Sequence, residues 1–186
     1  MNTWTAPLVR LTRALDGLAE WTGRAISWLT LLLVLDTFAV VVLRYLFSVG
    51  WIAMQESMTY LHAFVFLLGA AYTLRHDGHV RVDIVYRDLG PRARAWLDLL
   101  GTFVFLVPVC AFILWSSWGY VASSWALHEG SEEAGGLPLV YILKTAIPVM
   151  AVLMLIQGLS QTLHCVLTIA GVEGSPSGHR PADTEL

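Results

Sequence analysis

Apolar residues gather along this chain into four long runs, and each run ends at or near a cluster of charged residues. About 20 apolar residues, at ~1.5 Å per residue, cross the ~30 Å hydrocarbon core of a bilayer, and every run reaches that length. No strand-like alternation of apolar and polar positions appears, so a barrel is not expected. The pattern predicts an all-α integral membrane protein with four transmembrane helices, at about residues 25–47, 51–74, 96–125 and 137–170.

Two segments outside these runs have the pattern of short amphipathic helices. Between Leu8 and Trp21, apolar residues recur at helical spacing and charged residues fill the other positions. Such a helix lies in the membrane interface, so residues 1–24 are predicted to form a cytoplasmic amphipathic segment before a membrane domain at 25–170. A second apolar stripe between Val82 and Leu89 predicts another interfacial helix. Residues 171–186 have the composition of a disordered tail.

The charged residues predict the orientation of the four spans. Arginines precede the first run and fill the connection between the second and third runs, where they are Arg75, Arg81, Arg87, Arg92 and Arg94. The connection between the third and fourth runs instead carries three glutamates and no Lys or Arg; they are Glu129, Glu132 and Glu133. Because positive residues remain in the cytoplasm, both termini are expected to be cytoplasmic and the acidic loop to face outward.

The composition agrees with a membrane protein and excludes several other classes. Of the 186 residues, 56% are hydrophobic and 13% are charged, which is too few charges for a water-facing surface. The formal net charge of -3 argues against nucleic acid as a partner. No metal-ligand, phosphate-loop or hydrolase spacing is present, so we expect no enzyme activity and no catalytic, cofactor or metal site.

Polar residues inside the spans are the first candidates for function, because each costs roughly 2.5 to 3.5 kcal/mol at the centre of a membrane helix. Asp36 and His62 lie equally far on either side of Val49, so a helical hairpin would bring them together at mid-membrane. The spacing predicts a hydrogen bond or ion pair between Asp36 and His62. That pair could pin the helices, belong to a proton relay, or face a partner protein.

A second group of polar residues is expected near the outer surface. Arg44, Gln55 and Glu56 come to similar depth beside the first turn, and Lys144 enters the fourth span at about the same level. A carboxylate between two cations would satisfy charges that lipid cannot, so Glu56 is predicted to lie between Arg44 and Lys144. The same residues are candidates for holding helices together.

The stretch between the first and third spans resembles a known family. Its motifs, in chain order, are Arg44-Tyr45, Trp51, Gln55-Glu56, Leu68-Gly69-Ala70-Ala71, Arg75 and His79-Val80-Arg81-Val82-Asp83. This series is similar to the small membrane subunit of tripartite ATP-independent periplasmic (TRAP) transporters, the DctQ family. The fourth span matches by position and length.

The resemblance implies a function in an assembly of the bacterial inner membrane. The chain would brace a large TRAP permease subunit, which imports an organic acid with a sodium gradient after a periplasmic solute-binding protein delivers it. The solute would be selected by those other chains. Gly69 would allow close approach of a helix of this chain or of the permease. His79, Arg81 and Asp83 would form a structural corner, with Arg75 and Arg81 near the phosphates of membrane lipid.

Two hypotheses of other classes also follow from the residues. A membrane helix bundle with histidines could be an electron-transfer subunit that ligates haem, which needs two histidines at one depth. His62 lies near the middle of its span, whereas His164 lies about 9 Å from the end of its own, so they are mismatched. The other hypothesis is a stand-alone small proton-coupled transporter that uses Glu56 or Asp36 as its coupling acid.

Overall fold

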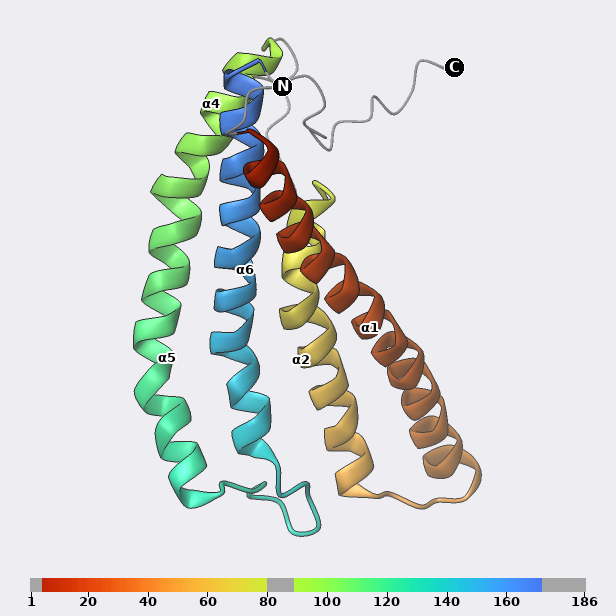
Figure 1. Ribbon diagram of the computed structural model, residues 1–186. Helices are drawn as coiled ribbons and strands as arrows, with labels where there is room; N and C mark the ends of the chain where they lie inside the picture. The colour runs from red at the N-terminus through yellow and green to blue at the C-terminus, as the bar shows by residue number, and fades with distance from the viewer. Residues whose placement is uncertain (1–4, 80–88, 172–186) are drawn as a thin grey trace, which may run out of the picture.

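The computed structural model of the chain describes residues 5–79 and 89–171, and this part is helical and contains no strand (Figure 1). Four helices are long and apolar enough to cross a membrane, which confirms the prediction of an all-α chain with four helices of membrane-spanning length. They are α1 (Thr5–Leu46), α2 (Ile52–Arg75), the continuous path α4 (Pro91–Gly101), η1 (Thr102–Leu106) and α5 (Val107–Leu127), and α6 (Val140–Ile169). Each predicted apolar run lies within one of them, apart from a few residues at its ends.

Helix α1 combines the amphipathic segment and the first span in one uninterrupted helix. It has 42 residues, which makes it about 63 Å long. After Pro7 in the first turn, where proline is tolerated, no residue interrupts its hydrogen bonds. Residues 8–21 are therefore not a separate helix, and their position at the membrane surface stays a prediction. The second predicted interfacial helix falls on residues 80–88, outside the described part of the chain.

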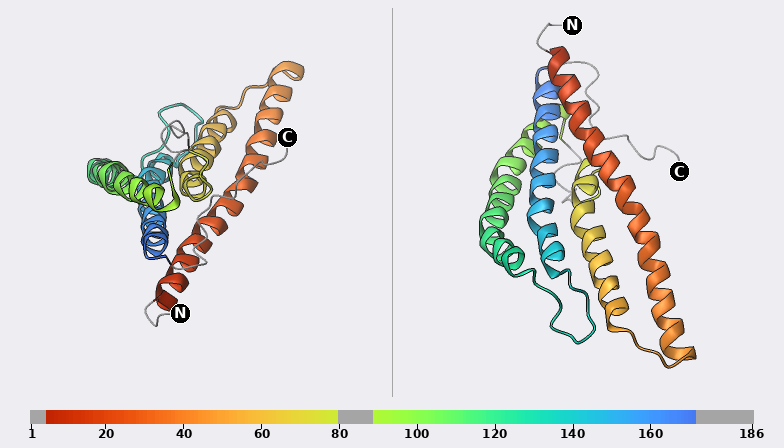
Figure 2. Two further views of the ribbon diagram at one scale, coloured as in Figure 1. Left: turned by 90° about the horizontal axis from the view of Figure 1, so that it is seen from above. Right: turned by 60° about the horizontal axis from the view of Figure 1, so that its bottom comes forward.

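The third span bends around a π-helical turn beside a proline. In this turn the N–H of Val107 bonds to the carbonyl of Thr102, one residue further back than in an α-helix. Pro108 follows directly and has no N–H, so the regular hydrogen-bond ladder is interrupted there. Figures 1 and 2 show the bowed course of the path from α4 to α5. The helix therefore accommodates Pro108 with a wider turn.

Helix α6 is the central element of the fold. It packs against α1, α2, α4 and α5, while α1 crosses obliquely over α2 and α6 (Figures 1 and 2). Small buried residues along α6 permit this close packing. At Gly158 an added Cβ would lie 2.7 Å from Cδ2 of Leu106, so only glycine fits without a shift.

The outer surface of the helices is strongly apolar. Large side chains on α1 and α5 are among the most exposed, with Phe38 at 67% and Trp115 at 84%. A water-soluble domain would bury such residues, whereas lipid or a partner helix covers them in a membrane. The polar contacts between helices therefore define the candidate sites.

Candidate assembly sites at the two ends of the helices

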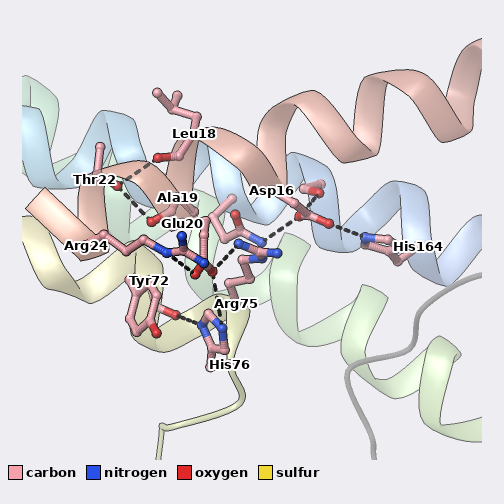
Figure 3. A network of polar contacts seen from close by, with 12 residues as sticks. Asp16, Leu18, Ala19, Glu20, Thr22, Arg24, Tyr72, Arg75, His76 and His164 are labelled. Atoms are coloured by element: carbon pink, nitrogen blue, oxygen red, sulfur yellow. Dashed lines mark hydrogen bonds and ion pairs between the residues drawn. The ribbon is translucent and has the colours of Figure 1, made fainter.

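The first polar site joins α1 to α6 through Asp16. Its Oδ1 accepts hydrogen bonds from Oγ of Ser160 at 2.6 Å and from Nε2 of Gln157 at 3.3 Å. Its Oδ2 lies 2.9 Å from Nε2 of His164 (Figure 3). The three partners are spaced three and four residues apart, which places them on one face of α6. One carboxylate thus binds three side chains of the central helix.

The same face of α1 binds α2 one turn later, through Glu20. Oε2 of Glu20 lies 2.6 Å from Nη1 of Arg75 and 3.5 Å from Nε2 of His76 (Figure 3). Its Oε1 pairs with Arg24 at 2.9 Å, but the Arg24 side chain is 78% exposed and such pairs contribute little. Arg75 is only 28% exposed, so its bond to Glu20 is the stronger link between the helices.

Close packing accompanies these bonds. Gly23 lies on the same stripe of α1, and a Cβ added there would lie 2.1 Å from Cδ2 of the Tyr72 ring. Tyr72 in turn packs against His76, with ring centroids 4.1 Å apart and ring planes tilted by 36°. We call Asp16, Glu20, Arg75, His76, Gln157, Ser160 and His164 the N-terminal cluster. It fixes α1 against both α2 and α6.

Sequence reasoning missed the acidic half of this cluster. The sequence pattern places Asp16 and Glu20 on the polar face of a predicted interfacial helix, and it predicts that Arg75 lies near lipid phosphates. In the structure Arg75 binds Glu20, and its nearness to lipid phosphates stays a prediction. The available signal was the spacing of Asp16, Glu20 and Gly23 at i, i+4 and i+7, which places two carboxylates and a gap for close approach on one stripe.

The second polar site binds the loop between α5 and α6 to the start of α2. Oε1 of Glu56 accepts a short hydrogen bond from Oγ of Ser131, and its Oε2 accepts one from the backbone N–H of Leu137 at 2.6 Å. Within the loop, the N–H of Ser131 donates to the carbonyl of Leu137 at 3.0 Å. A Cβ at Gly136 would lie 2.4 Å from Oγ of Ser131, so this position has no space for a side chain.

A neighbouring ion pair holds the other end of the loop. Nζ of Lys144 on α6 lies 2.5 Å from Oε2 of Glu129, and 4.0 Å from the ring centroid of Tyr120. The Lys144 hydrogen bond lowers the pKa of Glu129 below its usual value. We call Glu56, Tyr120, Glu129, Ser131, Leu137 and Lys144 the loop cluster.

In the loop cluster, Glu56 does not lie between two cations, contrary to the prediction from the sequence. Lys144 binds Glu129, and Arg44 is exposed near the end of α1. The physical reason is the loop itself: His128 adopts a left-handed conformation (φ 46°) and ends α5, and Glu129 follows it beside Lys144. A hydroxyl and a backbone N–H from the same loop then satisfy Glu56.

The predicted contact between Asp36 and His62 is not formed. Oδ2 of Asp36 accepts a hydrogen bond from Oγ of Ser57 at 2.6 Å. His62 is five residues further along α2 than Ser57, so it points about 140° away around the helix. The equal distance of Asp36 and His62 from the turn predicts an equal depth in the membrane, but not the direction in which each side chain points around its helix. The side chain of His62 is exposed.

The remaining sequence candidates lie apart from both clusters. Gln55 is partly buried, and a Cβ on Gly69 would meet no atom within 4 Å. Ala71, two residues further along α2, is 2% exposed. His79 is exposed, while Arg81 and Asp83 lie outside the described residues. Within the described ranges, no group of three His, Cys, Asp or Glu side chains could hold a metal ion.

Comparison with known protein families gives a match that covers most of the chain. The family model described as "Tripartite ATP-independent periplasmic transporters, DctQ component" matches residues 12–168. No curated protein and no solved structure matches the chain. The matched range runs from α1 to the last turn of α6 and contains all residues of both clusters.

Proposed function

The chain belongs to the DctQ family of TRAP transporter components, and on this premise we propose that it is the small permease subunit of a sodium-driven transporter. In this proposal it braces a large permease subunit, which imports an organic acid delivered by a periplasmic solute-binding protein. Membership of the family identifies a component of a transporter and not an enzyme.

The N-terminal cluster is the observation that carries this proposal. A subunit that braces a partner must keep its own helices in fixed positions while the partner moves. Here α1 is about 63 Å long, and two carboxylates one turn apart fix it to α2 and α6. Hydrogen bonds in which one partner is charged are stronger than neutral ones, so this crossing resists displacement. Such a cross-braced frame fits a static support.

The loop cluster supports the proposed orientation. With both termini cytoplasmic, the loop between α5 and α6 faces the periplasm of the bacterial inner membrane. Glu56 and Lys144 hold this loop at two points, and Glu132 and Glu133 remain exposed on it. A preformed acidic surface offers the binding protein a fixed docking position, because little conformational entropy is lost on binding.

Uptake measurements test the proposed function. Cells that make the large permease and the binding protein would be given a panel of labelled organic acids, with and without this chain and with and without sodium. We expect sodium-dependent uptake of at least one acid only when this chain is present. Uptake that is equal without the chain, or uptake by the chain alone, would contradict the proposal.

A further inference from the structure

One exposed stripe of α2 carries polar side chains at the depth of the bilayer centre. Thr59, His62 and Phe66 are all exposed, and their spacing of three and four residues places them on one face of the helix. His62 lies about 15 Å from the start of α2, which is itself about 36 Å long for its 24 residues. The imidazole is therefore near mid-membrane.

Among the residues that the structure describes, none is a polar partner of His62. Its ring stacks on Phe66, which is 72% exposed, with centroids 6.4 Å apart and planes at 16°. Within the described part of the chain, no hydrogen bond or ion pair engages either ring nitrogen of His62. The imidazole requires at least one donor or acceptor, and acyl chains supply neither.

The contrast with Asp36 supports this reading. Asp36 also lies at mid-membrane, about 15 Å from the end of α1, but its carboxylate faces α2 and accepts a hydrogen bond from Ser57. Polar groups inside membranes are expensive and commonly bind across helices. The fold therefore provides a hydrogen-bond partner for Asp36, whereas the side chain of His62 lies on the outer surface of α2.

We propose that the stripe of Thr59, His62 and Phe66 on α2 docks a transmembrane helix of the large permease subunit, which brings a hydrogen-bonding side chain to His62 at the bilayer centre. This proposal rests on the proposed function, because it names the surface through which the brace acts. The partner helix has small side chains or a groove opposite the stacked rings of His62 and Phe66. Its polar side chain is a hydroxyl, an amide or a carboxylate, each of which can bond to an imidazole nitrogen.

Photo-crosslinking tests which molecule covers the stripe. The photoreactive residue p-benzoylphenylalanine replaces Phe66 in the full chain, co-produced with the large permease in membranes. Phe112 on α5 serves as the matched control, since both phenylalanines are strongly exposed, at 72% and 66%. We expect an adduct with the permease from position 66 and far less from position 112.

Substitution of His62 tests the polar contact itself. His62→Leu is expected to lower the yield of permease that copurifies with the chain by roughly threefold to tenfold, in line with one interhelical hydrogen bond. His62→Gln keeps a donor and an acceptor and should retain the permease. Ser116→Leu, a change at an exposed polar position of α5, is the control and should have no effect.

The outcomes separate this inference from the function on which it rests. A wild-type chain that retains no permease overturns both. A wild-type chain that retains the permease overturns only this inference if position 66 gives no adduct, gives an adduct with a second copy of the chain, or reacts no better than position 112. Full copurification with His62→Leu also overturns it.

Discussion

At the scale of single residues, the polar contacts of this protein depend on direction around a helix more than on depth. Asp36 and His62 share a depth, yet Asp36 binds Ser57 and His62 faces outward. Glu56 satisfies both carboxylate oxygens on one loop, through a hydroxyl and a backbone N–H. Depth and charge, without direction around the helix, therefore predicted the wrong partners for these residues.

Glu56→Gln is expected to loosen the loop between α5 and α6. Glutamine keeps the shape but removes the negative charge, so the hydrogen bond from the N–H of Leu137 becomes a weaker neutral one, and the hydroxyl of Ser131 must turn to accept from the amide NH2. Limited proteolysis of the loop in detergent should become faster. Glu132→Gln, at an exposed position of the same loop, is the control. Equal cleavage rates for the two variants would contradict the described role of Glu56.

The ion pair of Lys144 and Glu129 predicts a dependence on pH. The pKa of Glu129 is lowered in the folded protein from 4.5, so its stabilising effect is complete above that pH. The effect is lost as the pH falls through the lower, folded value. The midpoint of thermal unfolding should therefore fall in acid more steeply for the wild type than for Lys144→Gln. Parallel curves for the two proteins would show that the pair contributes nothing.

At the scale of the elements, the long helix α1 is the main feature that the sequence pattern did not reveal. The change from an amphipathic pattern to a fully apolar one at about residue 25 predicted two segments, but nothing between them stops a helix. The four spans themselves were predictable, since hydropathy and length determine them. The crossing of α1 over α2 and α6 was not, because it depends on which side chains meet across helices.

Gly23→Ala is expected to weaken the contact of α1 with α2. The new methyl group would overlap the Tyr72 ring, at 2.1 Å from its Cδ2, and overpacking of this kind costs about 1 to 3 kcal/mol. The control is Gly17→Ala on the same helix, where a Cβ meets nothing within 4 Å and alanine favours the helix. Thermal unfolding in detergent should show a lower midpoint for the Gly23 variant only. The same midpoint for both variants would argue against the close crossing.

At the scale of the whole molecule, the described part of the chain is a cross-braced set of four helices of membrane-spanning length, with polar sites at both ends and an apolar surface between them. Family membership over residues 12–168 identifies this frame as a TRAP transporter component. The resemblance could be seen in the sequence, because its motifs follow one another between Arg44 and Asp83. The N-terminal cluster could not be seen in the sequence, because its residues lie far apart in the chain.

Thiol labelling tests the proposed orientation of the whole chain. Glu132→Cys and His79→Cys each place a thiol at an exposed position, at opposite ends of the helices. The native Cys110 and Cys165 are buried and should react slowly. With both termini cytoplasmic, a membrane-impermeant maleimide added outside should label the thiol at position 132 at once. Position 79 should react only after the membrane is opened, and the reverse order would contradict the orientation.

The most direct test of the bracing function is recovery of the chain from its native membrane. A tagged wild-type chain would be isolated in mild detergent, and the associated proteins would be identified by mass spectrometry. The account predicts a stable complex with a large permease subunit, in a colourless sample. A chain that is recovered alone, or with a haem absorbance band and no permease, would contradict it.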